Sequence, residues 1–274
     1  MADVAHPPET LEGWYSLHQV FQVHRSAVRA LPPDVLAQDR DAVADALSEL
    51  ANPIEGGWSV PVLLIGSRSD VMLVHFRPTL DSLRDAQNRL AHLRLMESLR
   101  VTSSHLGVTE AGLYHITAEL VRESETRGGA IGDETYRARL AERVDSERAS
   151  EHVQRRLYPP LPSDMPYVSF YPMSKKREPE ANWYTLPLSE RSELMHAHGQ
   201  VGRRYAGRVQ QIITGSIGLD EWEWGVTLFA REPLEFKKLV TDMRFDHASA
   251  VYAAFGEFFV GKVVSAGEWL GMLG

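Results

Sequence analysis

Tyr171, Lys175 and His198, in the second half of the chain, have the types and spacing that a redox site needs. The run Tyr167–Lys175 alternates like a β-strand, which aims the side chains of Tyr171, Met173 and Lys175 at one face. His198 follows on a segment with the apolar spacing of a helix. A strand with a phenol and an ammonium, next to a helix that presents an imidazole, indicates a redox site around a planar, apolar ligand.

The helix that begins after Ser189 places His198 at the centre of a stripe that we expect to be buried. Gly199 and Gly202 thin the helix surface beside the imidazole, as a large planar ligand would require. A single core histidine is usually only a hydrogen-bonded core residue, and a strand tyrosine is usually an ordinary aromatic, so both structural alternatives stay open. The residues at helical offsets from His198 are Leu194, Met195, Val201, Gly202 and Tyr205.

Further polar residues could face the same cavity. The strand Val209–Thr214 turns Gln211 to one face, and Arg244 and Ser249 follow an amphipathic helix where a cation and a hydroxyl could hold a carboxylate. Alternatively, Arg244 and Ser249 are ordinary surface residues that hold no ligand. Pro172 cannot donate a backbone hydrogen bond, so it predicts that its strand lies at a sheet edge or ends there.

The composition excludes several kinds of site and partner. The 274 residues are 43% hydrophobic and 24% charged, which are the proportions of a folded chain with a sizeable core. A formal net charge of -8 argues against nucleic acid as a partner and requires any acidic ligand to be held by local cations. Cysteine is absent from the sequence, which excludes disulfides and thiolate sites. No membrane-spanning run or signal-peptide pattern is found, so we expect a cytoplasmic protein.

The two halves of the chain share an order of elements. A strand at 71–76 with a following amphipathic run matches a strand at 226–229 with its own amphipathic run, and the sequence at 14–17 is echoed at 183–186. Each half reads as strand, helix, hairpin, helix, strand, the order of a ferredoxin-like unit. We predict an α+β fold in which two ferredoxin-like repeats face each other through their sheets.

Between the halves lies a segment rich in Arg, Glu, Ser and Gly, with its likeliest break at 127–129. Most of it is expected to be a charged surface helix, although a connection of this length could also cover a site entrance. The predicted division is an N-terminal repeat at 1–121, a charged connector at 122–156 and a C-terminal repeat at 157–274 that holds the site.

Several segments resemble the coproheme decarboxylases of the chlorite dismutase-like superfamily, in the form found in Firmicutes. The first half matches loosely, through GWYSLHQVFQV and LYHITAELVRE. The second half matches specifically, through FYPMSKKRE, NWYTLP, LMHAHGQVGRRYAGRVQQIITGSIGLDEWEWGVTLFA, EFKKLVTDMRFDHASA and FGEFFVG.

The resemblance implies a dimeric α+β barrel within one chain, five such chains in a homopentameric ring, and an iron porphyrin bound only by the second repeat. It implies the hydrogen peroxide-dependent oxidative decarboxylation of two propionates of Fe-coproporphyrin III (coproheme) to give haem b through harderohaem. This would be the last step of coproporphyrin-dependent haem biosynthesis, where a transient contact with ferrochelatase would fit.

The resemblance also implies roles for individual residues. His198 matches the iron ligand, Tyr171 the tyrosine that becomes the oxidising radical, and Lys175 the lysine near the second reactive propionate. Met173 matches a residue lying against the porphyrin, and Gln211 matches the glutamine on the side of the iron opposite the histidine. The positions that match propionate-binding groups are Tyr114, Arg156, Arg244 and Ser249.

One departure from the wider superfamily limits the chemistry. Functional chlorite dismutases have an arginine where this chain has Gln211, so degradation of chlorite is not expected. Two alternatives to the decarboxylase stay open: a haem-binding carrier or sensor without turnover, and a chlorite dismutase-like peroxidase. The sequence names no base for peroxide deprotonation.

Overall fold

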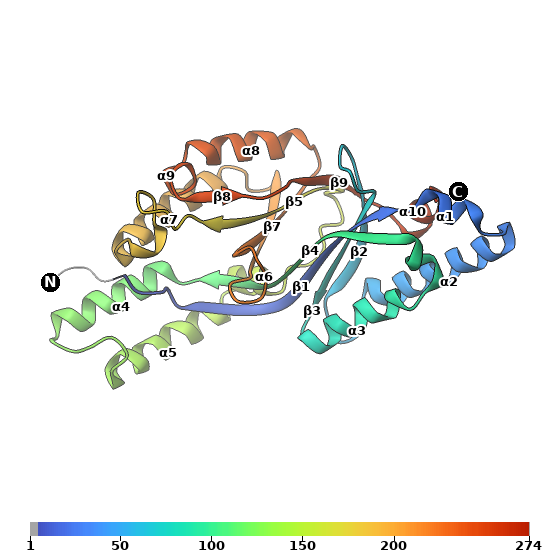
Figure 1. Cartoon of the computed structure of the whole chain (residues 1–274). Helices are drawn as coiled ribbons and strands as arrows, with labels where there is room; N and C mark the ends of the chain where they lie inside the picture. The colour runs from blue at the N-terminus through green and yellow to red at the C-terminus, as the bar shows by residue number, and fades with distance from the viewer. Residues whose placement is uncertain (1–4, 274) are drawn as a thin grey trace.

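The computed structural model describes residues 5–273, which form two units that share one closed sheet, joined by three helices (Figure 1). The first unit consists of β1 (Thr10–Val23), α1 (Arg25–Ala30), α2 (Pro33–Ala51), β2 (Trp58–Leu64), β3 (Val71–Arg77), α3 (Leu80–Ala91), η1 (Arg94–Ser98) and β4 (Leu99–Gly112). The joining helices are α4 (Tyr114–Thr126), α5 (Glu134–Ala149) and α6 (Glu151–Leu157). The second unit consists of β5 (Tyr167–Lys175), η2 (Trp183–Thr185), α7 (Leu188–Arg203), β6 (Val209–Gly215), β7 (Trp224–Ala230), α8 (Leu234–Phe245), α9 (His247–Ala250), β8 (Ala253–Phe255), β9 (Phe259–Val263) and α10 (Ala266–Gly271).

Each unit has the strand order of a ferredoxin-like fold. The order is β4-β1-β3-β2 in the first unit and β9-β5-β7-β6 in the second, with every pair antiparallel. β2 pairs with β9 and β4 pairs with β6, so each unit covers the edge strands of the other. Eight strands therefore close into a barrel, with β8 added beside β5. The expected α+β fold of two ferredoxin-like repeats is confirmed.

Aromatic rings and histidines fill part of the barrel interior. His18 of β1 is stacked on Phe170 of β5, with ring centroids 4.1 Å apart, and Phe170 lies 6.4 Å from Phe259 of β9. His18 is directly opposite His105 of β4, and both are buried. Because burial lowers the pKa of both imidazoles, they are neutral members of the core.

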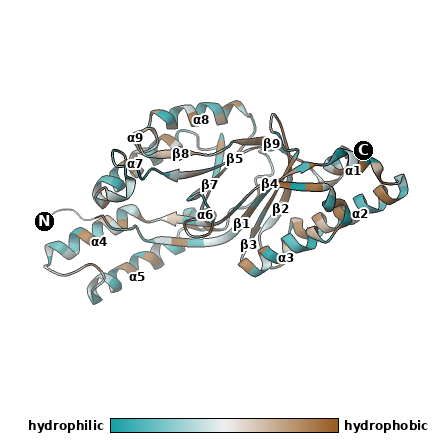
Figure 2. Ribbon diagram, viewed as in Figure 1, coloured by the Kyte–Doolittle hydropathy of each residue, from teal (hydrophilic) through white to brown (hydrophobic). Residues whose placement is uncertain are grey.

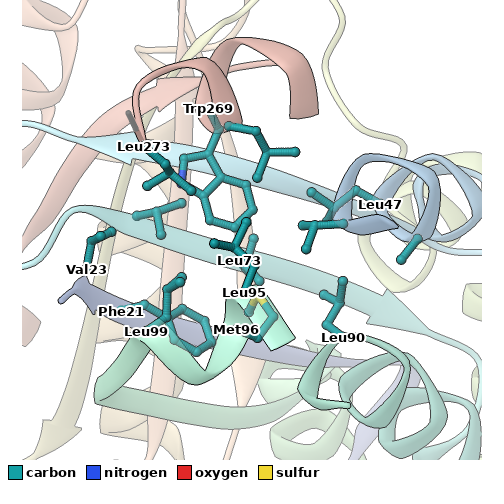
Figure 3. Packing of buried hydrophobic residues seen from close by; sticks show 14 of the residues in the cluster. Phe21, Val23, Leu47, Leu73, Leu90, Leu95, Met96, Leu99, Trp269 and Leu273 are labelled. Atoms are coloured by element: carbon teal, nitrogen blue, oxygen red, sulfur yellow. The ribbon is translucent and has the colours of Figure 1, made fainter. Parts of the chain in front are cut away.

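A second core lies outside the barrel, between the sheet of the first unit and helices α2, α3 and α10 (Figure 3). Leu47 of α2, Leu73 of β3, Leu90 of α3 and Trp269 of α10 are each less than 5% exposed. Figure 2 shows the alternation of hydrophobic and hydrophilic residues along α2 and α3 that produces such a buried face. The C-terminal helix thus completes the core of the first unit.

Local sequence signals account for several helix boundaries. Thr79 and Ser82 form a capping box at the start of α3, and Ser265 and Glu268 form another at the start of α10. Pro33 occupies the first position of α2, where its missing N–H costs nothing. Within residues 5–273, no helix combines the length and the apolarity needed to cross a membrane.

The joining helices differ in how much they are buried. The predicted break is confirmed: α4 ends at Thr126, and Gly128 adopts a left-handed φ of 70°. α5 is mostly exposed, as expected for a charged surface helix, and Tyr136 is its buried residue. The division of the chain at 121 and 156 stays a prediction. In the structure, α4 runs through position 121, and the C-terminal helix α10 packs on the first unit.

Two expectations from the sequence are wrong. β5 is not an edge strand, since β7 pairs with one side of it and β9 and β8 pair with the other. Pro172 is accommodated because β9 pairs as far as Phe170 and β8 pairs from Met173, so the missing N–H falls at the junction. The echo between 14–17 and 183–186 is not structural, because the first lies within β1 and the second in and around η2.

Candidate active site

Tyr171 lies on the outer face of β5, in the layer that packs against α8 and against Tyr205, which follows α7. Its ring is stacked on Phe258, with centroids 4.3 Å apart, and the residue is 8% exposed. The Arg244 guanidinium lies 3.9 Å from the centroid of Phe255, whose ring also contacts Tyr171. Burial raises the pKa of Tyr171 to about 12, although Arg244 acts in the opposite direction. The phenol is therefore protonated at neutral pH and has a cation nearby.

Lys175 ends β5 with its ammonium group buried. Its Nζ donates to the Ala248 carbonyl oxygen at 3.1 Å and lies 4.1 Å from the centroid of the Trp183 ring. Burial lowers the pKa of Lys175 to about 8, while Asp246 and Glu223 act to raise it. An ammonium has three N–H donors. One bonds the Ala248 carbonyl and the group also lies over the Trp183 ring, so at least one N–H stays available for an anion.

His198 projects from α7 toward the turn that precedes α9. Its Nδ1 is 2.9 Å from Asp246 Oδ2 and 3.4 Å from Ser249 Oγ. Because a carboxylate only accepts hydrogen bonds, we assign the proton to Nδ1, which leaves Nε2 with a free lone pair. The Asp246 side chain is 4% exposed and also caps α9 by accepting from the Ser249 N–H. The imidazole is thereby oriented as a metal ligand would be.

The stripe around His198 is half-buried, which corrects the expectation that it would be buried. The imidazole side chain is 31% exposed. Gly199 and Gly202 leave little side-chain volume on this helix face to cover it. A Cβ atom at Gly202 would lie 3.4 Å from Gln211 Nε2, so the amide of Gln211 on β6 reaches the helix surface one turn beyond His198. Of the other residues in the stripe, Leu194, Met195 and Val201 are partly exposed and Tyr205 is buried.

Met173 connects β5 to a second group of polar residues. It is paired with Trp224 on β7, whose Nε1 donates to Glu110 Oε1 at 2.8 Å. Burial raises the pKa of Glu110, and the charge of Arg156 acts against that shift. Burial also raises the pKa of Tyr114, on which Glu110 acts as well. Glu110 therefore bonds to the sheet face that carries Met173 and lies within electrostatic range of Arg156 and Tyr114.

The predicted site residues gather on the outer face of the second unit and its border with α4 and α6. Asp246 is central among residues that sequence reasoning missed, because it contacts His198 and acts electrostatically on Lys175. Its position just before α9, as a helix-capping residue type, was an available signal. Glu110 and Trp224 had no local signal, since they meet only when β4 and β7 are brought together.

The donor set suits a flat metal complex with anionic edges. His198 offers one nitrogen with a free lone pair, while Lys175, Arg244 and Arg156 offer cations from three different elements. Met173 offers a partly exposed thioether on the intervening sheet face. A metal held here would take its axial ligand from α7 and its charge balance from the surrounding cations.

Comparison with known proteins confirms the resemblance expected from the sequence. The model of the family described as chlorite dismutase matches residues 40–264. A coproheme decarboxylase from Staphylococcus saprophyticus is 38% identical over 264 residues, which cover 94% of this chain and 94% of that protein. A protein from Natronomonas pharaonis described as heme-binding is 39% identical over 264 residues, and the match covers 96% of this chain but 41% of that longer protein.

Solved structures give the same fold. A heme-binding protein from Thermus thermophilus superposes with a TM-score of 0.82 at 33% identity, covering 97% of each chain. A mutant chlorite dismutase from Candidatus Nitrospira defluvii superposes with a TM-score of 0.70 and covers 96% of each chain. At 18% identity, the second match supports the fold alone.

Proposed function

The chain belongs to the chlorite dismutase family, and we propose that it is a decarboxylase whose substrate is iron coproporphyrin III (coproheme). Hydrogen peroxide is the oxidant, haem b is the product and harderohaem is the intermediate that has lost one carboxyl group. The observation that carries this proposal is a buried, protonated phenol at Tyr171 beside the cation Arg244, on a strand that ends in the buried ammonium of Lys175.

The reaction converts two propionates into vinyl groups. For each one, a propionate, one hydrogen peroxide and one proton give a vinyl group, carbon dioxide and two waters. The bond from the β-carbon to hydrogen and the bond to the carboxylate break, and a carbon–carbon double bond forms. The porphyrin iron supplies the oxidising power once peroxide has reacted with it.

Tyr171 is the relay between the oxidant and the propionate. Because burial keeps its phenol protonated at neutral pH, Tyr171 gives up a proton and an electron together. The resulting phenoxyl radical takes a hydrogen atom from the β-carbon, which restores the phenol. The second electron would pass from the substrate radical to the peroxide-oxidised porphyrin as the bond to the carboxylate breaks and the vinyl double bond forms. Phe255 and Phe258 enclose the ring and limit the access of water to it, while Arg244 holds the carboxylate of the same propionate.

The remaining cations and hydroxyls hold the other propionates. The substrate brings about four negative charges into an acidic protein, and burying carboxylates without partners would cost several kcal/mol each. Lys175 holds the second reactive propionate with the available N–H of its ammonium group. The remaining propionate partners are Arg156, Tyr114 and Ser249.

His198 would hold the iron through Nε2. The hydrogen bond from Nδ1 to Asp246 fixes the ring and makes Nε2 a more basic donor. Gln211 would lie across the iron from His198, where an uncharged amide would not attract an anion such as chlorite.

Product analysis tests the proposal directly. We expect the purified protein, mixed with iron coproporphyrin III and peroxide, to give a product that mass spectrometry shows to have lost two carboxyl groups. The Tyr171→Phe variant keeps the buried ring and should bind the substrate without forming either product. Absence of carboxyl loss with the unaltered protein would refute the decarboxylase, and normal turnover by the variant would remove Tyr171 from the mechanism.

A haem-binding carrier or sensor is the second candidate, because two of the similar proteins are described only as heme-binding. It requires His198 and a pocket but no relay. Tight retention of haem b, without preference for the substrate with four propionates and without turnover, would favour it. Oxygen release from chlorite would favour a chlorite dismutase-like peroxidase. The homopentameric ring, the contact with ferrochelatase and the cytoplasmic location stay predictions.

A further inference from the structure

Glu223 is a buried carboxylate beside the proposed site, in the segment before β7, and it is 7% exposed. Its Oε2 accepts a hydrogen bond from the backbone N–H of Lys175 at 2.7 Å. The backbone N–H of Glu223 donates to Ser174 Oγ at 3.2 Å. Its carbonyl oxygen accepts from the Ser216 N–H at 2.8 Å. Glu223 therefore ties the last residues of β5 to the residue that follows β6.

The same carboxylate also acts on the ammonium group of Lys175. Two carboxylates have an electrostatic effect on this ammonium: Asp246, from the turn before α9, and Glu223. The other groups against it, the Ala248 carbonyl and the Trp183 ring, carry no net charge. A buried lysine loses its proton readily unless carboxylates offset the loss of hydration.

The two carboxylates are not equivalent. Asp246 is already shared between His198 Nδ1 and the Ser249 N–H. Glu223 forms an ion pair with Arg177, whose Nε is 4.0 Å from Oε1 and whose side chain is 69% exposed, so solvent weakens that pair. The Tyr184 phenol also interacts with Glu223, which contributes to the raised pKa of that tyrosine after burial. Asp246 has the larger effect on the Lys175 ammonium but also holds the imidazole of His198, whereas Glu223 acts on Lys175 and on the end of β5.

We propose that Glu223 is a positioning residue for Lys175: it fixes the end of β5 through the backbone and keeps the buried ammonium charged. Because Lys175 holds the second reactive propionate, this role rests on the proposed function. Loss of the charge at Glu223 then slows removal of the second carboxyl group and leaves removal of the first, beside Arg244, unchanged.

The test compares Glu223→Gln with Glu221→Gln, which removes an exposed carboxylate two residues away. Glutamine keeps an oxygen that can accept from the backbone N–H of Lys175, and it removes only the negative charge of the carboxylate. In protein without porphyrin, NMR of isotope-labelled lysine side chains, with Lys175→Arg to assign the signal, should show the midpoint of Lys175 lowered by roughly half a pH unit or more. Glu221→Gln should leave that midpoint unchanged.

Turnover gives the second readout. With iron coproporphyrin III and peroxide, Glu223→Gln should accumulate the intermediate that has lost one carboxyl group, by about twofold over the unaltered protein at pH 8, because half a unit roughly halves the charged fraction there. At pH 6 the two proteins should agree. An unchanged lysine midpoint together with an unchanged product ratio would overturn the inference, whereas no carboxyl loss by the unaltered protein would refute the proposed function instead.

A second variant covers failure of Glu223→Gln to fold. Glu223→Asp keeps the charge while shortening the reach to the Lys175 N–H. Its lysine midpoint should stay close to that of the unaltered protein. A midpoint lowered in Glu223→Asp would show that charge is not the cause and would also overturn the inference.

Discussion

The helix-covered outer faces of the two units differ in how completely their buried cations are bonded. In the first unit, Arg77 is 1% exposed and donates to the carbonyl oxygens of Trp58, Phe76 and Leu50 and to Ser59 Oγ, at 2.8–3.0 Å. In the second unit, Lys175 is 8% exposed and donates to a single carbonyl oxygen.

The difference teaches where bonding capacity is left for a ligand. The face of the first unit is completed by hydrophobic side chains that include Trp269 of α10 (Figure 3). Its cation, Arg77, is surrounded by acceptors. The face of the second unit carries a half-exposed imidazole and an ammonium with an N–H available. The cation of the first unit is thus fully bonded, whereas the second unit has donors left for the ligand that we propose. The predictions below separate these two roles.

The largest expected effect is on stability and comes from the first unit. Trp269→Ala removes a ring that is 1% exposed and should lower the free energy of unfolding by about 3–5 kcal/mol. Met272→Ala, at a side chain that is 62% exposed near the end of the same helix, is the control and should have little effect. Urea unfolding measures both. Activity per folded molecule should be retained in Trp269→Ala, and its selective loss would contradict the separation of roles.

The next largest effect concerns the orientation of His198. Asp246→Asn keeps a residue that caps helices well but removes the carboxylate that holds the imidazole, so affinity for an iron porphyrin should fall about 10-fold to 100-fold. Titration followed by absorption measures it. Asp242→Asn is the control, because Asp242 bonds the Tyr205 hydroxyl instead. Equal affinities for both variants would mean that Asp246 does not orient the ligand.

The effect that is smallest per unit of change is a pH dependence that originates in the first unit. Burial, with Arg77 adding to it, lowers the pKa of His75 from its usual 6.5 to about 3. Between these values the unfolded chain binds a proton that the folded chain does not. The free energy of unfolding should therefore fall by about 1.4 kcal/mol per unit as the pH drops from 6.5 toward 3. His18, whose pKa is also lowered, adds to this loss.

Urea unfolding at several pH values measures that dependence. His75→Asn keeps a polar group for the Ser59 hydroxyl, which lies 2.7 Å from His75 Nδ1, and should make the dependence shallower. A dependence as steep in His75→Asn as in the unaltered protein would assign the acid sensitivity to other groups.

The order of elements could be predicted from the sequence, but the closure of the barrel could not. Alternation identified β5 with its residue bounds, and the strands expected at 71–76, 209–214 and 226–229 lie within β3, β6 and β7. Closure depends on β2 meeting β9 and β4 meeting β6, which joins strands far apart in the chain. The error at Pro172 has the same origin, because the rule that places proline at an edge could not anticipate a junction between two partner strands.

The site was predictable where its signals are periodic. Alternation placed Tyr171 and Lys175 on one face, and helical spacing selected His198. Asp246, Glu110 and Glu223 were missed because each contacts the site only across the fold. Periodicity also made the His198 stripe look buried, since it records which residues share a face and not how completely that face is covered.

The most direct test of the central claim, that the second unit binds an iron porphyrin through His198, is an absorption spectrum of His198→Ala with iron coproporphyrin III. His196→Ala, at an exposed position two residues earlier, is the matched control. We predict that the control keeps the spectrum of the unaltered protein, and that His198→Ala loses the bands of a histidine-ligated iron and regains them when imidazole is added. A spectrum of His198→Ala identical to that of the unaltered protein would contradict the account.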